Sequence, residues 1–247
     1  MYTPIEIHQD ILVKRDDLYK FGTHSGGKVR TCVYLAKGAK GLITAGSRHS
    51  PQVAMVSYIA KQNNIPCRVH IPIGDDTTET IEATNNGAEI IRHKPGYNSV
   101  IVKRANADAT VNKQYTYIPF GMECVEAVNQ TKQQVNNLIG VNIKRIVIPV
   151  GSGMSLAGLL TGLIDNNLDI PVLGIQVGAD PIKRLNKYAP FLWKDMVEIK
   201  KATLPYGKLV EHNMLGDLVL DPIYEAKCIE HLKCGDLLWV VGIRKKN

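Results

Sequence analysis

Lys28 follows two consecutive glycines in the segment Ser25-Gly26-Gly27-Lys28-Val29-Arg30. Glycine permits positive φ angles and a close approach of the backbone to another group. A lysine that is held at such a turn and partly desolvated loses its proton more readily, and its amine can then form a Schiff base with an aldehyde. An isolated Gly-Gly-Lys fits equally a solvated lysine at the start of a helix, so the role of Lys28 depends on the rest of the chain.

A second glycine- and serine-rich segment is Gly151-Ser152-Gly153-Met154-Ser155, which follows an apolar run and precedes an apolar helical pattern. Backbone amides at such a turn point outward and the helix dipole adds positive potential, so a phosphate group suits this position. The glycines let the backbone approach, and the serines can donate hydroxyl hydrogen bonds. The segment matches neither the Walker A pattern nor the dinucleotide-binding pattern, because no Gly-Lys-Ser/Thr follows and Leu156 takes the third glycine position. It favours phosphate slightly over an ordinary tight turn.

A third candidate segment is Ser47-Arg48-His49-Ser50-Pro51-Gln52. Ser50 before Pro51 is typical of a helix N-cap followed by proline at the first helical position. A helix N-terminus is also suited to a substrate carboxylate, so Ser50 is a candidate for both roles. His49 and Gln52 are candidate substrate contacts beside it, although polar turn residues are the plainer interpretation.

The fourth candidate segment is Leu220-Asp221-Pro222-Ile223-Tyr224-Glu225-Ala226-Lys227, where Asp221-Pro222 again predicts a cap and a helix start. Glu225 near a helix N-terminus is usually explained by the helix dipole. In a chemical role, its carboxylate could keep a pyridine nitrogen protonated, and Tyr224 could act as an acid or base. Tyr206 is a weaker candidate, since half-buried tyrosines are common.

Short β-rich runs alternate with amphipathic stretches along most of the chain. The predicted strands cover residues 41–45, 67–71, 89–92, 145–150 and 172–176, and the predicted helices cover residues 51–63, 77–86, 123–138 and 156–164. This alternation predicts an α/β fold with parallel sheets and helices on both faces. The polar segment 95–115 is expected to hold one helix and a connection. We expect residues 38–120 to form a small domain, and residues 1–37 and 121–247 to form a large one.

Composition sets further bounds. The 247 residues are 45% hydrophobic, which is enough for one large core or two small ones. Thirty basic against 23 acidic residues give a net charge of +7, a mild bias toward acidic or phosphorylated partners, and Arg244-Lys245-Lys246 reads as a solvated end. Five cysteines without a CxxC pair predict no disulfide framework and no metal site. No signal peptide or membrane-spanning run is visible, so we expect a cytoplasmic protein.

These segments, in this order, resemble the 1-aminocyclopropane-1-carboxylate deaminase and D-cysteine desulfhydrase family. Lys14-Arg15-Asp16-Asp17-Leu18 with Gly26-Gly27-Lys28-Val29-Arg30 is similar to "KRDDL…GGNKxRK", and residues 42–52 are similar to "LITAGGxQSNxxR". Residues 151–155 match the family's phosphate loop, and residues 220–227 resemble "LDPVYEGK". The resemblance implies a fold-type II pyridoxal-phosphate enzyme with a two-domain, tryptophan synthase β-like fold.

The resemblance also implies roles for the candidate residues. Lys28 would bind pyridoxal 5'-phosphate as an internal aldimine and later move protons at the substrate Cα. The large domain would bind the cofactor, with the phosphate held by Gly151, Ser152, Gly153, Met154 and Ser155. Ser50 would contact the substrate carboxylate or Lys28, whereas Tyr224 and Tyr206 would face the substrate. Glu225 stands where the deaminase branch places a carboxylate against the pyridine nitrogen. Relatives are commonly homodimers.

Three departures from the family pattern affect the expected function. Gly27 and Pro51 replace two asparagines that lie near the cofactor ring hydroxyl in relatives, and Val240-Val241-Gly242 replaces the usual "HTGG". The chain is also short for the family. The cofactor therefore follows from the sequence more directly than the substrate does.

Three functions remain open. The first is an enzyme of the deaminase or lyase type that acts at Cα of a small amino acid through Lys28. The second is an enzyme of the kind carried by some viral genomes, which decarboxylates or otherwise processes an amino acid attached to a modified base in DNA, and would then work in the host cytoplasm. The third is a non-catalytic protein that binds pyridoxal phosphate for sensing or structure.

Overall fold

The computed structural model describes residues 1–94 and 96–242, so the basic segment Arg244-Lys245-Lys246 lies outside the described residues. The chain divides into two compact units. The large unit contains Met1–Gly27 and the chain from Val125 onward, and the small unit contains Lys28–Cys124. From the sequence we expected the small domain to cover residues 38–120. The small unit of the structure begins earlier, at Lys28, and so includes most of helix α1 (Gly27–Leu35).

The large unit is built on a six-stranded sheet in the order β1-β2-β14-β9-β10-β11. Its strands are β1 (Ile5–His8), β2 (Ile11–Arg15), β14 (Asp236–Val240), β9 (Arg145–Val150), β10 (Val172–Gln176) and β11 (Val197–Lys201). The five strands from β2 to β11 run parallel, as expected. Strand β1 is the exception: it pairs antiparallel with β2 through a tight turn at Gln9 and Asp10, which both have positive φ.

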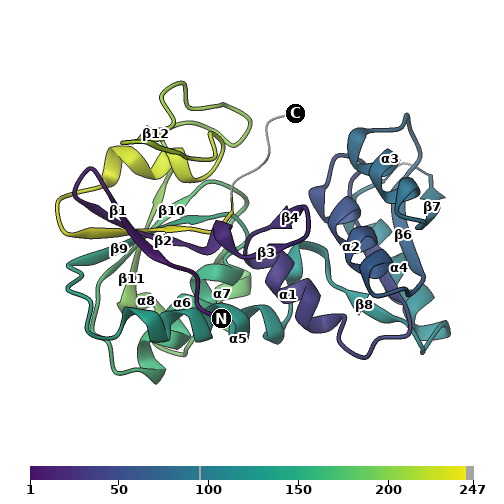
Figure 1. Cartoon of the computed structure of the whole chain (residues 1–247), viewed down its shortest axis with the longest axis horizontal. Helices are drawn as coiled ribbons and strands as arrows, with labels where there is room; N and C mark the ends of the chain where they lie inside the picture. The colour runs from purple at the N-terminus through teal and green to yellow at the C-terminus, as the bar shows by residue number, and fades with distance from the viewer. Residues whose placement is uncertain (95, 243–247) are drawn as a thin grey trace. The chain divides into compact units, whose positions relative to one another are not determined.

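Different segments cover the two faces of this sheet (Figure 1). Helices α5 (Val125–Val135) and α6 (Met154–Asp165) pack together on one face, where Gly158 leaves room for α5: a Cβ there would lie 2.5 Å from the Thr131 Cβ. The other face is covered by the C-terminal segment, which includes the 3-10 helix η4 (Glu225–His231) and buries Leu220, Ala226 and Cys228 against the sheet. Helices therefore lie on both faces, as the sequence predicted, and on this second face the helix is a 3-10 helix flanked by loops.

Shorter elements complete the large unit. They are η1 (Asp16–Leu18), the strand pair β3 (Lys20–Phe21) and β4 (His24–Ser25), η3 (Asn136–Leu138), α7 (Ile182–Tyr188), α8 (Trp193–Met196), and the strand pair β12 (Met214–Leu215) and β13 (Leu218–Val219). The helix expected over residues 123–138 is therefore α5 followed by η3.

The small unit is an all-parallel, four-stranded sheet with helices on both faces. Its strand order is β7 (Glu89–His93), β6 (Cys67–Pro72), β5 (Leu42–Ala45) and β8 (Thr116–Ile118). Helix α4 (Asn98–Val111) packs Ile101 and Ala105 against Ile43 and Ala45 of β5. Helices α2 (Pro51–Gln62) and α3 (Thr78–Asn85) follow β5 and β6, and the short helix η2 (Phe120–Met122) follows β8. The helix expected within residues 95–115 is α4.

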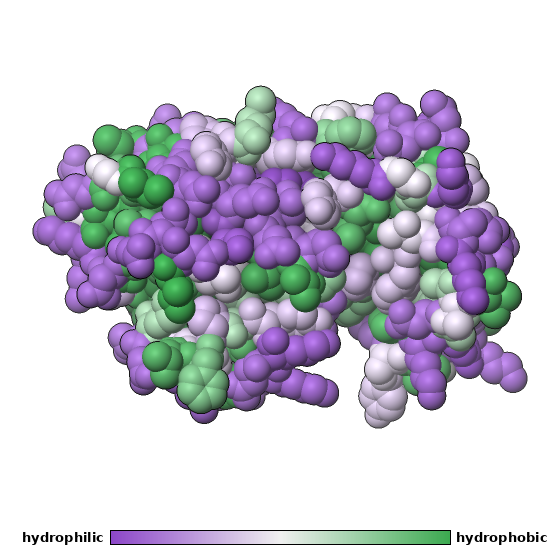
Figure 2. All heavy atoms as spheres, turned by 90° about the horizontal axis from the view of Figure 1, so that it is seen from below, coloured by the Kyte–Doolittle hydropathy of each residue, from purple (hydrophilic) through white to green (hydrophobic). Residues whose placement is uncertain are grey.

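The surface gives no sign of a membrane-spanning helix. Within residues 1–94 and 96–242, no helix combines the length and the apolar character needed to cross a bilayer. On the face drawn in Figure 2, hydrophobic side chains are interspersed among hydrophilic ones.

Candidate functional site

The glycine- and serine-rich segment forms the turn between β9 and α6 in the large unit. Gly153, the N-cap of α6, has φ +92°, a conformation that favours glycine, and a Cβ there would lie 3.0 Å from the Pro181 Cβ. Gly178 passes so close that its own Cβ would lie 3.0 Å from the Gly151 carbonyl oxygen. The glycines are thus required by close packing of the turn, which fixes the backbone in one shape.

This turn has free backbone donors. Among the described residues, the amides of residues 152–155 find no hydrogen-bond partner, as expected at the first turn of a helix. Ser152 and Ser155 are half-buried beside them. The amides and the positive end of the 12-residue helix α6 make the turn suitable for an anionic group such as a phosphate.

Tyr224 and Tyr206 lie next to this turn. The Tyr224 ring packs on Gly151, where a Cβ would lie 3.0 Å from the Tyr224 Cε1. The Tyr206 ring meets the Tyr224 ring edge to face, with 5.8 Å between centroids. The Asp221 Oδ1 accepts hydrogen bonds from the amides of Ile223 (2.8 Å) and Tyr224 (3.0 Å) in a turn that precedes the helix. The expected helix start at Asp221-Pro222 is wrong, because η4 begins at Glu225 and its N-cap is Tyr224. The large unit therefore brings the two tyrosines and the Gly151 turn together.

Glu225 is a buried carboxyl group with half of its hydrogen-bonding capacity unused. Its side chain is 1% exposed, and Oε1 accepts hydrogen bonds from the amides of Val241 (3.1 Å) and Gly242 (3.2 Å). Within the described part of the chain, the buried Oε2 has no hydrogen-bond partner. Burial, with a contribution from the Asp221 charge, raises the pKa of Glu225 to about 8. The group therefore has one oxygen available for a donor or acceptor that the protein itself does not supply.

The backbone before Lys28 is anchored at the same strand end that holds Glu225. The Gly27 amide donates to the Val241 carbonyl oxygen at 3.2 Å. Gly26 has φ +104°, and a Cβ there would lie 3.3 Å from the same oxygen, so the sequence correctly indicated that this turn needs glycine. Lys28 follows as the second residue of α1. Val241 and Gly242 were not predicted as site residues, because they act through backbone amides and carry no side-chain signal.

The Lys14–Leu18 part of the opening motif serves packing. Lys14 is fully buried, and its Nζ donates to the Thr3 carbonyl oxygen at 2.6 Å. The Arg15 guanidinium binds the Asp17 carboxylate through two hydrogen bonds of 2.9 and 2.8 Å. These contacts tie β2 and η1 to the rest of the large unit.

In the small unit, Ser50 is the N-cap of α2 by position, and Pro51 is the first helical residue, as expected. The expected side-chain cap is absent: the Ser50 hydroxyl makes no capping hydrogen bond in the described structure. The turn before it is tight, because a Cβ on Gly46 would lie 3.1 Å from the Ser50 Cβ. Ser50 is half-buried and His49 is exposed at the same turn.

Gln52 is a buried bridge within the small unit. Its Nε2 donates to the Thr44 Oγ1 (3.0 Å) and the Pro119 carbonyl oxygen (2.9 Å), and its Oε1 accepts from the Gly121 amide (2.9 Å). These bonds hold α2, β5 and the turn after β8 together, which explains the residue structurally. A contact of Gln52 with substrate stays a prediction.

Comparison with known proteins identifies the family. Residues 3–195 match the family described as "Pyridoxal-phosphate dependent enzyme". A protein of Pyrococcus horikoshii named "Putative 1-aminocyclopropane-1-carboxylate deaminase" is 26% identical over 256 residues, covering 90% of this chain and 78% of that protein.

Solved structures show the same fold. The structure described as an ACC deaminase homologue superposes with a TM-score of 0.78 at 23% identity, covering 98% of this chain and 89% of that one. Threonine deaminase isoform 2 of Solanum lycopersicum superposes with a TM-score of 0.71 at 12% identity, covering 99% and 80%. The fold is therefore the tryptophan synthase β-like fold expected from the sequence.

The large unit fits the cofactor of this family. The turn at residues 151–155 offers amides to a phosphate, the Tyr224 ring borders that turn, and the buried Oε2 of Glu225 lacks a partner that a protonated pyridine nitrogen would provide. Together with the match over residues 3–195, these features show that the chain belongs to the family of pyridoxal-phosphate dependent enzymes.

Proposed function

We propose that the protein acts at Cα of a small amino acid, as a deaminase or lyase, with Lys28 as the residue that holds the cofactor covalently. The observation that carries this proposal is the buried Glu225 carboxyl, whose Oε2 has no partner among the described residues. When bound, pyridoxal phosphate supplies an electron sink for the pair released at Cα, and a protonated ring is the better sink. In this proposal the Glu225 carboxyl would give its proton to the ring nitrogen and, once ionised, would keep that nitrogen protonated.

The other residues of the large unit take roles that follow from their chemistry. The amides of residues 152–155 hold the phosphate and so fix the orientation of the ring. Tyr224, which packs on Gly151, lies beside the turn at residues 151–155, where its hydroxyl can hold or move a proton. Tyr206 supports the Tyr224 ring edge to face. In this proposal Lys28 would hold the cofactor, and its amine would move the proton at the substrate Cα.

In this proposal the turn before α2, within the small unit, binds the carboxylate of the substrate. The Ser50 hydroxyl is not used for capping, and the first amides of α2 add positive potential at the same turn. His49, exposed at this turn, is a further candidate contact. The curated relative named as a putative deaminase supports a reaction of the deaminase type, and it leaves the amino acid open for this protein.

The proposal is tested first by the cofactor link. The purified protein should be yellow, and borohydride should fix the cofactor to the peptide that contains Lys28. Lys28→Ala should lose this covalent link, whereas Lys37→Ala, which removes an exposed lysine of the same unit, should retain it. A borohydride-fixed cofactor on another lysine would contradict the assignment.

The reaction is tested by incubating the holoenzyme with a panel of L- and D-amino acids and with 1-aminocyclopropane-1-carboxylate. Release of ammonia with a 2-oxo acid supports the deaminase or lyase activity. Spectral changes without product for every compound would instead favour the non-catalytic binding protein. Product from an amino acid attached to DNA, with none from free amino acids, would favour the DNA-linked substrate.

A further inference from the structure

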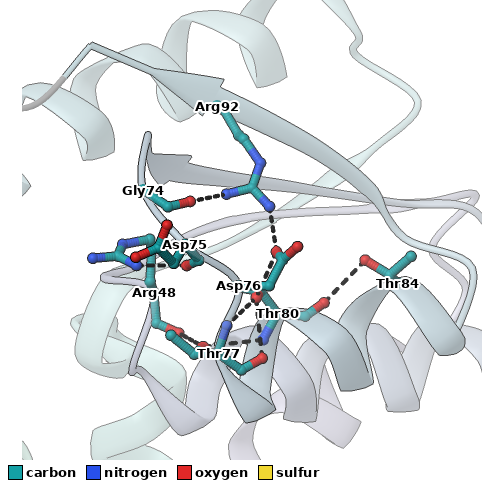
Figure 3. A network of polar contacts seen from close by, with 8 residues as sticks. All are labelled: Arg48, Gly74, Asp75, Asp76, Thr77, Thr80, Thr84 and Arg92. Carbon is teal, nitrogen blue, oxygen red and sulfur yellow. Dashed lines mark hydrogen bonds and ion pairs between the residues drawn. The ribbon is translucent and has the colours of Figure 1, made fainter.

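Arg48 ties the turn before α2 to the loop between β6 and α3 (Figure 3). Its Nη1 donates to the Asp75 carbonyl oxygen at 2.5 Å. Its own carbonyl oxygen accepts a hydrogen bond from the Thr77 Oγ1, also at 2.5 Å. The residue is therefore held at its main chain and at the end of its side chain by the same loop.

The guanidinium group of Arg48 packs flat against a glycine. Gly74 has φ +153°, and a Cβ at this position would lie 2.5 Å from the Arg48 Cζ and 2.6 Å from its Nε. Any other residue at position 74 would therefore displace the Arg48 side chain. The fit between Gly74 and Arg48 is specific to this pair.

The loop that receives Arg48 is itself braced. Arg92 of β7 donates to the Gly74 carbonyl oxygen at 2.8 Å and forms an ion pair with Asp76. Thr77 and Thr80 form a reciprocal capping box at the start of α3, in which the Thr77 amide donates to the Thr80 Oγ1 at 2.8 Å. Arg48 thus connects the turn before α2 to a loop that is held in place by Arg92 and by the capping box of α3.

The turn needs this support because its usual brace is missing. Ser50 makes no side-chain cap, and its amide closes the turn by donating to the Ser47 carbonyl oxygen at 3.0 Å. We propose that Arg48 is a positioning residue that keeps residues 47–50 in the shape in which Ser50 and the first amides of α2 receive the substrate carboxylate. The carboxylate role of this turn rests on the proposed function.

The first readout is the mobility of the turn, which does not depend on activity. Hydrogen exchange followed by mass spectrometry on the holoenzyme should show faster exchange in the peptide spanning residues 46–53 for Arg48→Gln and for Gly74→Ala. The second variant keeps every charge and displaces the guanidinium by the added Cβ. Arg104→Gln, an exposed arginine of α4, is the matched control and should exchange like the wild type.

The second readout is binding of a carboxylate, measured by absorbance titration of the bound cofactor. The probes are L- and D-alanine, and ethylamine, which has the same amine and no carboxylate. Both turn variants should weaken alanine binding by about tenfold, the effect of one misplaced hydrogen bond to a charged group, and should leave ethylamine binding unchanged. Arg48→Lys, which can still reach the Asp75 carbonyl oxygen, should recover part of the loss.

The outcomes separate the two proposals. Unchanged exchange of the 46–53 peptide in both variants overturns the positioning role of Arg48, and so does an equal effect of Arg104→Gln. Faster exchange with unchanged alanine binding, also in Ser50→Ala, supports the positioning role and overturns the carboxylate role of the turn. A similar loss for alanine and ethylamine overturns the inference, because the effect would then lie at the cofactor.

Discussion

Replacing Glu225 by glutamine should stabilise the cofactor-free protein at neutral pH and slow the enzyme. The glutamine keeps an Oε1 that accepts from the Val241 and Gly242 amides, and it removes the only ionisable group at this position. Burial raises the pKa of Glu225 to about 8, from an ordinary value of 4.5. Between about pH 4.5 and pH 8, the folded protein therefore binds a proton at Glu225 that the unfolded chain has lost.

The size of the effect follows from this raised pKa. Because the folded pKa is raised, the stabilising contribution is complete below about pH 4.5 and is lost progressively as the pH rises toward 8. The interval from pH 4.5 to pH 7 is 2.5 pH units. At about 1.4 kcal/mol for each unit, the free energy of unfolding of the wild type falls by about 3 kcal/mol over this interval. Glu225→Gln does not undergo this loss. The difference in free energy of unfolding between the variant and the wild type should therefore be small near pH 5 and largest near pH 8.

The assay is urea unfolding of the cofactor-free wild type and variant at several pH values between about 5 and 8. The difference between the two proteins isolates Glu225 from the other titrating groups. Glu211→Gln, which neutralises an exposed carboxylate of the same unit, should show no comparable trend. A stability difference that stays constant across this range would refute the buried, protonated carboxyl. The same variant should turn over more slowly with bound cofactor, because the glutamine amide can neither give a proton to the ring nitrogen nor balance its positive charge.

Three further predictions concern groups elsewhere in the two units. Gly153→Ala should destabilise the large unit by about 1–2 kcal/mol in urea unfolding and weaken phosphate binding, because φ is +92° there, whereas Gly207→Ala, with open space around it, should not. Lys227→Met should speed hydrogen exchange around Tyr206, since the Lys227 Nζ donates to the Pro205 carbonyl oxygen at 2.8 Å; unchanged exchange would refute this role. Burial lowers the pKa of His70 despite its 2.9 Å contact with Asp108, so the small unit should lose stability as the pH falls below about 6.5. Hydrogen exchange of β6 should therefore become faster at low pH, and His70→Asn should make this increase smaller.

The sequence patterns correctly predicted those strands and turns that depend on residues close together in the chain. Strands β9 and β10 lie at the expected residues, and the turn at 151–155 joins a strand to a helix as expected. Strands β1, β2, β11 and β14 were not predicted. Strands β2 and β14 pair with each other across more than two hundred residues, which no local pattern encodes.

The site was predictable to the extent that side-chain chemistry reveals it. Glycines at positions 26 and 153 were expected for backbone reasons, and both have positive φ. The sequence could not show that Val241 and Gly242 bind Glu225 through their amides. It also could not show that Gln52 meets Pro119 and Gly121, because that bridge exists only after β5 and β8 have paired.

The place of β14 in the sheet has a consequence for how the protein is made. This strand comes after the other five in the chain, yet it lies between β2 and β9 and hydrogen-bonds to both. During synthesis, the β1–β2 hairpin and the strands β9, β10 and β11 therefore cannot be joined in one sheet until β14 has been made. The amides that hold Glu225 follow directly after it. The same late segment of the chain therefore links the two parts of the sheet and holds the Glu225 carboxyl.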